Sequence, residues 1–410
     1  MRETITILLF DVDGVIVDPR AYKIGASKTL ELLCAKIGLT DSLALMPTDE
    51  EIAYFESCGV HDVWDITNIL FCQILVSLSE KFAGEKVAVD LKSKSIEQQL
   101  QEFKGKNCEI SRPDYLRLAD QIAQTEGAPH PPDVALRVLS AEICAEPAAR
   151  ENWLELLNRF LKSTRSAYDS FGTRLFQNII LGSPEFARTY DLPSEYDGPS
   201  LLETEDVVFI NQQSVSLLDQ LRKRSDYRMA IYTARPSHPP KSEPIRVGYS
   251  PEAEMALTAA NLLDAPLVAM GMMEWLAKRH NERTEDLTKP NRTQALAALI
   301  AACAGFSDIE ILEEAYEVDK HNANPSDTHL RTLKEYSSTV FVFEDTTSGI
   351  KPLLKAAELL NQKGYEIAVR PLGIAKDENK KAALAPYCES VFANVNEALA
   401  FATGNVQTQS

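Results

Sequence analysis

Apolar residues follow two patterns along this chain, and each pattern predicts one kind of element. Short apolar runs of the kind that form strands buried on both faces of a parallel sheet stand at the start of the chain and in its second half. These runs are residues 6–10, 228–232, 267–270, 339–343, 367–369 and 391–393. In the second half, helical spacing separates them at 215–224, 252–263, 273–280 and 291–304. The alternation predicts an α/β fold with a Rossmann-like, doubly wound parallel sheet.

A long helical region interrupts this pattern after the first strand. Apolar residues near helical spacing occupy 22–37, 60–82, 113–126, 132–144 and 151–168, and strand signals are scarce. The turn-rich segment 191–199 ends the region. We therefore expect a discontinuous α/β core of residues 1–18 and 205–402, an all-helical domain at 19–204, and a frayed tail at 403–410. Residues 306–336 are expected to be a peripheral helical excursion.

Composition excludes several classes of partner. Sixty acidic residues against 42 basic ones give a net charge of -18, which disfavours nucleic acid and anionic membrane surfaces. No apolar run approaches the roughly 18 residues of a membrane span, and no leader pattern is evident, so we expect a cytoplasmic protein. The seven cysteines include no close CxxC pair, which favours reduced thiols over a zinc site or a disulfide framework.

Candidate chemistry is concentrated where predicted strands end. Asp11 and Asp13 directly follow the first strand, and Gly14 after them permits a sharp turn and a close approach to a ligand. Open parallel sheets bind ligands just beyond the carboxyl ends of their strands. The two aspartates are therefore placed for chemistry, although an Asp-x-Asp-Gly alone is equally compatible with a solvated loop.

Three further positions downstream, two at strand ends and one at the start of a helix, carry polar or charged groups of the same kind; we call all four positions tips. Thr233 ends the second strand, and Ala234 and Arg235 follow it. Lys289 stands at the entrance of a predicted helix, where its ammonium group can point at a bound phosphate. The strand at 339–343 ends in Glu344 and Asp345.

In this order and in these contexts, the four tips resemble the four motifs of the haloacid dehalogenase-like (HAD) superfamily of phosphotransferases. The helical region has the position of that superfamily's C1-type cap, in enlarged form, and Trp64-Asp65-Ile66-Thr67 is similar to a cap segment of some larger members. The resemblance implies a Mg²⁺-dependent reaction and assigns roles to residues by motif. The catalytic residues would be Asp11, Asp13, Thr233 and Lys289, the substrate-binding residues Thr233, Ala234, Arg235 and Lys289, and the metal ligands Asp11, Asp13, Glu344 and Asp345.

The residue types fit these roles chemically. A carboxylate can attack phosphorus to give an aspartyl-phosphate, which makes Asp11 the candidate nucleophile. A second carboxyl, Asp13, could protonate the leaving group and then deprotonate water. A hydroxyl and an ammonium group, from Thr233 and Lys289, would stabilise the phosphoryl oxygens. Carboxylate oxygens and the Asp13 carbonyl are ligands that suit Mg²⁺.

The leading hypothesis is a Mg²⁺-dependent phosphatase that hydrolyses a small phosphate monoester, with a small phosphorylated metabolite as its partner. A phosphomutase is an alternative, because residues 10–18 and 343–345 also resemble β-phosphoglucomutase-like members. Dehalogenation is disfavoured, since an alkyl halide needs neither Mg²⁺ nor a general acid. A non-catalytic phosphate-binding or interaction protein is the alternative from another class.

Overall fold

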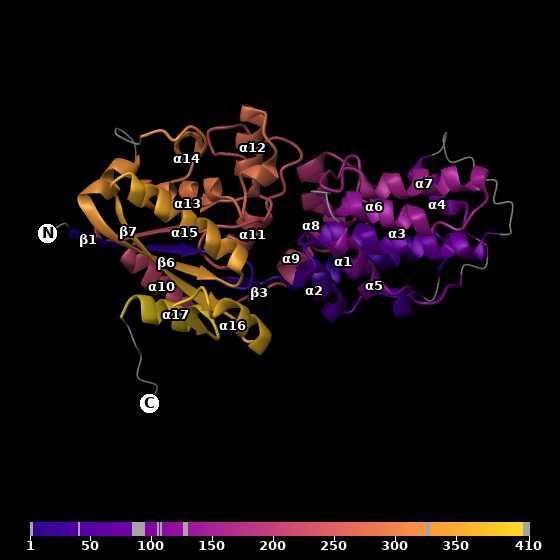
Figure 1. The fold of residues 1–410 in the computed structure, drawn as a ribbon, viewed down its shortest axis with the longest axis horizontal. Helices are drawn as coiled ribbons and strands as arrows, with labels where there is room; N and C mark the ends of the chain where they lie inside the picture. Colours follow the sequence, from indigo (N-terminus) through magenta and orange to yellow (C-terminus); the bar gives the residue numbers. More distant parts are fainter. Residues whose placement is uncertain are drawn as a thin grey trace. The chain divides into compact units, whose positions relative to one another are not determined.

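A computed structural model describes residues 3–39, 42–83, 95–104, 106, 109–125, 130–324 and 329–404. The chain divides into two compact units, one of Met1–Pro19 with Asp206–Ser410 and the other of Arg20–Glu205. Most of the expected C-terminal tail, residues 405–410, lies outside the described residues. Figure 1 traces both units, and we consider each by itself.

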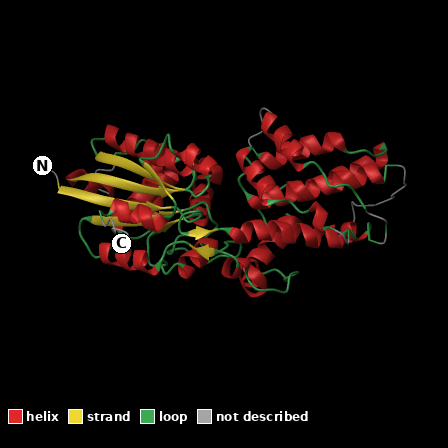
Figure 2. Ribbon diagram, turned by 90° about the horizontal axis from the view of Figure 1, so that it is seen from below, coloured by secondary structure: helices red, strands yellow, loops and turns green. Residues whose placement is uncertain are grey.

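The α/β unit contains a six-stranded sheet in the order β5-β4-β1-β6-β7-β8, and all its neighbouring strands are parallel. Its strands are β1 (Glu3–Phe10), β4 (Tyr227–Tyr232), β5 (Leu267–Val268), β6 (Tyr336–Glu344), β7 (Glu366–Ile374) and β8 (Ser390–Phe392). The sheet is central to the unit in Figure 2. The first strand in sequence is central in space, since β1 pairs with β4 on one side and with β6 on the other. The predicted α/β fold class is confirmed.

Helices cover both faces of this sheet, with α13 and α15 on one side and α10 and α17 on the other (Figure 1). The helices of the unit are α10 (Gln212–Leu221), α11 (Glu252–Ala259), α12 (Met270–His280), α13 (Arg292–Ala304), α14 (Ile309–Lys320), α15 (Thr347–Gln362), α16 (Glu378–Leu384) and α17 (Val395–Ala402), with 3-10 turns at Thr284–Asp286 and His329–Glu335. Successive side chains of β1 enter opposite cores: Ile7 and Leu9 join one cluster, while Leu8 and Phe10 join the other. Burial on both faces explains why the strands read as continuous apolar runs.

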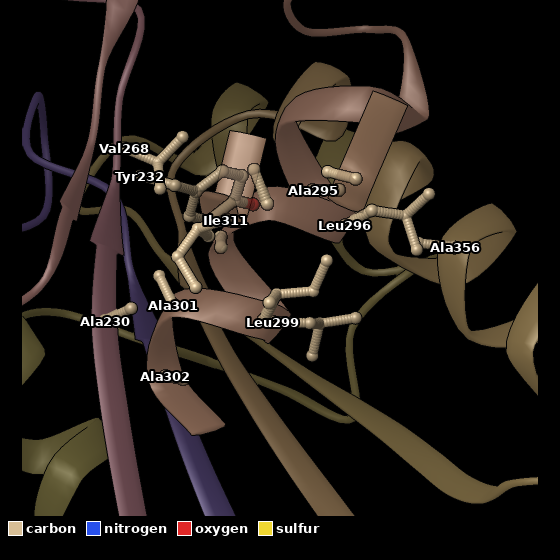
Figure 3. Close-up of a cluster of buried hydrophobic side chains, with 14 of the residues drawn as sticks. Ala230, Tyr232, Val268, Ala295, Leu296, Leu299, Ala301, Ala302, Ile311 and Ala356 are labelled. Carbon is tan, nitrogen blue, oxygen red and sulfur yellow. The ribbon is translucent and has the colours of Figure 1, made fainter. Parts of the chain in front are cut away.

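The core on the α13 face is built from small side chains (Figure 3). Every residue from Thr293 to Ala302 on α13 is buried, and five of them are alanines. Small side chains let the helix lie close to Ala230 of β4, and Leu296 and Leu299 fill the remaining space toward Ala356 of α15. Truncation of Leu296 or Leu299 to alanine is expected to cost about 2–5 kcal/mol, because this dense packing cannot collapse around the cavity.

The second unit is helical, and α3 (Val63–Lys81) forms its core. Fifteen of the 19 residues of α3 are buried. The remaining helices are α1 (Arg20–Lys36), α2 (Asp49–Ser57), α4 (Ile96–Gln101), α5 (Tyr115–Gln124), α6 (Pro131–Glu142), α7 (Pro147–Leu161), α8 (Phe171–Tyr190) and α9 (Leu201–Thr204), with a 3-10 turn at Leu43–Leu45. Phe71 of α3 packs against Phe160 of α7, with ring centroids 4.8 Å apart. No helix in the described part of the chain is both long and apolar enough to cross a membrane.

The predicted helix bounds differ from the structure at some points. The helix predicted over 151–168 ends at Leu161, because Ser163 adopts a left-handed conformation with φ of 58°. Helix α8 was not predicted, since Gly182 and Pro184 interrupt its apolar spacing and Gly182 has non-helical dihedrals. Met270, expected to end a strand, begins α12.

A two-stranded antiparallel ribbon lies where the chain passes between the units. Its strands are β2 (Val17–Asp18) and β3 (Val207–Val208), with Val17 opposite Val208. The chain leaves the α/β unit after Pro19 and returns at Asp206. The two crossings of the chain are therefore neighbours in space.

Candidate active site

The carboxyl end of β1 opens into a tight turn that carries the first two candidate residues. The Asp11 N–H still donates to the Phe343 carbonyl at 3.0 Å, so the ladder with β6 holds the Asp11 backbone. The chain then turns at Gly14, which has φ of +71° and donates to the Val17 carbonyl at 2.8 Å. A Cβ atom at Gly14 would collide with the Asp345 carboxylate. Glycine is therefore required here both for its backbone conformation and for the space it leaves.

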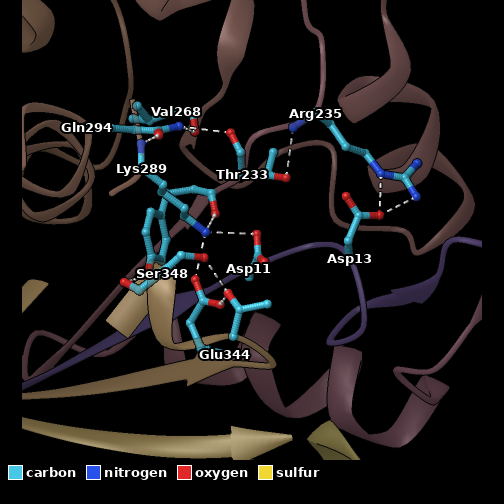
Figure 4. A network of polar contacts seen from close by, with 12 residues as sticks. Asp11, Asp13, Thr233, Arg235, Val268, Lys289, Gln294, Glu344 and Ser348 are labelled. Carbon is cyan, nitrogen blue, oxygen red and sulfur yellow. Dashed lines mark hydrogen bonds and ion pairs between the residues drawn. The ribbon is translucent and has the colours of Figure 1, made fainter. Parts of the chain in front are cut away.

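Lys289 links the carboxyl ends of two strands (Figure 4). Its Nζ lies 3.1 Å from Asp11 Oδ1 and 2.6 Å from Glu344 Oε1, and it lies 3.8 Å from the centre of the Tyr232 ring. Only 8% of the Lys289 side chain is exposed. Burial disfavours the ammonium form, but the Asp11 and Glu344 carboxylates outweigh it and raise the pKa of Lys289. The group is a fixed positive charge among acids.

Three buried carboxylates, those of Asp11, Glu344 and Asp345, form a cluster whose closest oxygens all lie within 4.8 Å of one another. Burial raises the pKa of Asp11 to about 6, of Glu344 to about 7 and of Asp345 to about 6, and neighbouring carboxylates add to each shift. Such a concentration of negative charge is unfavourable unless a cation joins it. The donors are all hard oxygens, so the cluster fits Mg²⁺.

Glu344 is the most enclosed member of this cluster, with no exposed surface. Its Oε1 accepts a hydrogen bond from the Lys289 ammonium group, and its Oε2 accepts one of 3.3 Å from the Thr346 hydroxyl. A Cβ atom at Gly349 would overlap the same carboxylate, so α15 begins directly against it. Glu344 is thus foremost the counter-ion of Lys289, with any metal contact additional to that pairing.

Thr233 and Ala234 follow β4 beside this cluster. Thr233 is fully buried, and its Oγ1 accepts a hydrogen bond of 3.2 Å from the Arg235 N–H, which leaves its hydroxyl proton to be donated elsewhere. Ala234 is exposed between two buried residues.

Arg235 and Asp13 form an ion pair apart from Lys289 (Figure 4). Arg235 Nε and Nη2 lie 2.7 and 2.6 Å from the same oxygen, Asp13 Oδ1. Arg235 Nη2 also lies 2.9 Å from Asp206 Oδ2. The Arg235 side chain is 1% exposed, whereas that of Asp13 is 32% exposed. Substrate binding by Arg235 stays a prediction; the contacts described for its side chain are to Asp13 and Asp206.

Gln294 is a part of the site that the sequence did not single out. This fully buried amide on α13 donates to the Thr233 carbonyl at 2.8 Å and accepts from the Lys289 N–H at 3.1 Å. It thereby holds the second and third tips in register with each other. The sequence offers little signal, since Gln294 is the third polar residue, after Arg292 and Thr293, at the start of a helix that is apolar from Ala295 onward.

Lys380 was also not predicted. It lies on α16, and its ammonium group pairs with Asp345 Oδ2. This contact lowers the pKa of Asp345, against the larger effect of burial. Nothing in the run Asp377–Lys381 distinguishes this lysine from the solvated charges around it.

Comparison with solved structures shows the fold and no more. Northeast Structural Genomics Consortium target ZR25 is 16% identical, with a TM-score of 0.64 over 99% of both chains. YfnB from Bacillus subtilis, named as a candidate HAD-hydrolase and bound to magnesium, is 10% identical with a TM-score of 0.33, over 98% of this chain and 100% of its own. That second likeness is too low to carry an argument. No protein-family model matches the sequence, and no curated protein matches it.

Proposed function

We propose that this protein is a Mg²⁺-dependent phosphatase of the HAD-like superfamily that hydrolyses a small organic phosphate monoester. One observation carries the proposal. The Asp11 carboxylate stands at the carboxyl end of the central strand, paired with Lys289 at 3.1 Å and grouped with Glu344 and Asp345 within 4.8 Å. A nucleophile, a buried cation and a hard-ligand cluster at one sheet edge are the groups that phosphoryl transfer through a carboxylate requires.

Asp11 is the proposed nucleophile. Its carboxylate would attack phosphorus as the bond from phosphorus to the leaving oxygen breaks, giving an aspartyl-phosphate. Asp13 would supply the proton that the leaving oxygen needs and would then take a proton from the attacking water. The 32% exposure of Asp13 suits a group that exchanges protons with substrate and water.

Thr233, Ala234 and Lys289 are the proposed groups around the phosphoryl oxygens. The Thr233 hydroxyl and the Ala234 N–H would donate hydrogen bonds, and Lys289 would supply positive charge where negative charge accumulates. Gln294 contacts the backbone of both Thr233 and Lys289, so these donors would be preorganised before the substrate arrives. Preorganised donors need no reorganisation during the reaction.

Mg²⁺ would be held by Asp11 and Asp345, with the Asp13 carbonyl and Glu344 as further ligands, and when bound it would neutralise the carboxylates that face a phosphate dianion. We propose that the helical unit is an enlarged C1-type cap. A small phosphorylated metabolite is the proposed partner, and the net charge of -18 disfavours nucleic acid or a membrane.

A panel of phosphate monoesters tests the proposal. The purified protein, supplied with Mg²⁺, should release inorganic phosphate from at least one ester, and a chelator should abolish the release. Asp11→Asn protein serves as the matched inactive control. A folded, Mg²⁺-supplied protein that hydrolyses no ester would overturn the proposal and favour a phosphate-binding role. Conversion of a phosphorylated sugar to its isomer without phosphate release would favour the phosphomutase.

A further inference from the structure

The Arg235 ion pairs are the feature of the site that the proposed chemistry leaves unused. This arginine is buried, and its guanidinium joins two carboxylates that are 193 residues apart in the chain, Asp13 and Asp206. Its backbone is fixed as well, because its N–H donates to Thr233 Oγ1 and its carbonyl accepts from the Met270 N–H at 3.1 Å. Arg235 is therefore held both at its backbone and at its guanidinium group.

The contacts on Asp13 are one-sided. Both Nε and Nη2 of Arg235 approach Oδ1, at 2.7 and 2.6 Å. Within the described residues, no hydrogen bond is made to Oδ2 of Asp13. A guanidinium is a rigid planar fork, so its two contacts hold the position of Oδ1 and leave the Oδ2 oxygen for another partner.

We propose that Arg235 is a positioning residue that holds Asp13 through Oδ1, with Asp206 as its second anchor, so that Oδ2 is the oxygen that transfers protons. This inference rests on the proposed function. In the first step the Oδ2 proton moves to the leaving oxygen as its bond to phosphorus breaks. In the second step water attacks phosphorus, gives a proton to Asp13 Oδ2 and releases the Asp11 carboxylate. Arg235 touches neither phosphorus nor the leaving group.

Substrates with different leaving groups test this role. An alkyl phosphate needs a proton on its leaving oxygen, whereas p-nitrophenyl phosphate departs as a stable anion and needs little protonation. Arg235→Met should therefore lower kcat/KM, which reports formation of the aspartyl-phosphate and not its hydrolysis, about 100-fold for an alkyl phosphate, the scale of lost general acid catalysis, and less than about fivefold for p-nitrophenyl phosphate. Arg228→Met is the matched control, because Arg228 lies on β4, the strand that leads to Arg235, and its described hydrogen bonds are to the backbone carbonyls of Ser225 and Tyr227.

A double-mutant cycle adds a readout that a purely structural role would not change. In an Asp13→Asn background, Arg235→Met should cost less than about twofold further, because a residue that acts through Asp13 has nothing left to position. Additive losses would overturn the proposal. A rise in KM for both substrates, with an equal rise in the inhibition constant of inorganic phosphate, would assign Arg235 to substrate binding and also overturn it.

A second variant keeps the test open if Arg235→Met does not fold. Asp206→Asn is nearly isosteric, and its amide oxygen still accepts from the guanidinium, so the fold should be kept while the anchor is weakened. It should lower kcat/KM for the alkyl phosphate about tenfold, with kcat/KM for p-nitrophenyl phosphate nearly unchanged. Equal losses on both substrates would count against the positioning role. Failure of the proposed function is a different result, since the parent protein itself would then hydrolyse neither ester.

Discussion

The two units bury different kinds of polar group. Among the described residues, the buried polar side chains of the helical unit are hydroxyls and amides, with Asp65 as the one buried acid. In the α/β unit, charged groups are prominent among them. These are Asp11, Arg235, Glu252, Glu344 and Asp345. Both units fold around apolar cores, so the difference does not arise from fold stability alone.

Asn68 illustrates the pattern in the helical unit. Its Nδ2 donates to the Trp64 carbonyl at 2.8 Å and to Thr173 Oγ1 at 3.1 Å, while its Oδ1 accepts from Ser170. Buried neutral groups whose hydrogen bonds are all made within the protein stabilise the fold and leave no donor or acceptor for a ligand. The α/β cluster instead holds carboxylates whose pKa values are raised by burial. Buried carboxylates with raised pKa values are typical of functional sites, because a bound cation can compensate negative charge that the protein itself leaves uncompensated.

The largest effect expected from this contrast follows from removing the nucleophile. Asp11→Asn should lower phosphate release at least about 1000-fold, because the amide is nearly isosteric but cannot form the acyl phosphate. The same change should leave the melting temperature equal or higher, since it removes one of three clustered negative charges. Phosphate-release assays and thermal melts on one preparation check both parts. A folded Asp11→Asn protein with parental turnover would contradict the mechanism.

The next effect concerns stability against pH without divalent cations. Burial raises the pKa of Glu344 from 4.5 to about 7 and that of Asp345 from 3.8 to about 6, so the folded state holds these protons more tightly than the unfolded state does. The free energy of unfolding should therefore fall as the pH rises from about 4 to about 7, and Mg²⁺ should restore it at pH 7. Melting temperatures in chelator across this range test the direction. Asp345→Asn should flatten the curve, and equal slopes in variant and parent would count against the cluster as the source.

A smaller effect is expected from breaking a neutral network. Asn68→Ala should lower the stability of the helical unit by about 1–3 kcal/mol, because Thr173 and Ser170 lose a buried partner. The pH dependence of stability should stay parental, which separates this network from the acidic cluster. Urea unfolding measures the loss, and Gln362→Ala, an exposed amide on α15, is the control. A loss no larger than that of the control would show that the Asn68 network contributes little.

The smallest effect concerns Lys380, which pairs with Asp345 at the proposed metal position. Lys380→Met should lower the Mg²⁺ concentration needed for half-maximal thermal stabilisation about two- to fivefold, since the cation no longer displaces an ammonium group. The factor is modest because the Lys380 side chain is 42% exposed and its attraction is screened by solvent. Lys381→Met is the matched control, because Lys381 pairs with exposed Glu378 instead. A higher Mg²⁺ requirement in Lys380→Met would reverse the assigned role.

The sequence predicted the sheet well because burial on both faces leaves a continuous apolar run. All six strands of the sheet fall on predicted runs, although β7 extends from Glu366 to Ile374 where only residues 367–369 were expected. Arg370 and Pro371 hide its continuation, since a charge and a residue without an N–H are both unusual within a strand. Helix α8 was hidden in the same way by Gly182 and Pro184.

For the site, the sequence predicted residues that stand at strand ends or at a helix entrance, but not the residues that hold them. Asp11, Lys289, Glu344 and Asp345 lie together in the structure. Asp206, Gln294 and Lys380 could not be identified, because each contacts a site residue at least 29 positions away in the chain and their local contexts are those of ordinary surface or helical residues. Contacts of this kind depend on the folded geometry, and periodicity along the chain carries no information about them.

The ribbon of β2 and β3 has a consequence for how this protein can be altered. Opposite residues of an antiparallel pair lie about 5 Å apart, so Asp18 and Val207 bring the two ends of a 186-residue insertion side by side. A segment with adjoining ends can be lost, exchanged or grafted onto another loop without stretching the chain at either junction. The helical unit can therefore change in sequence and size without altering the register of the sheet into which it is inserted.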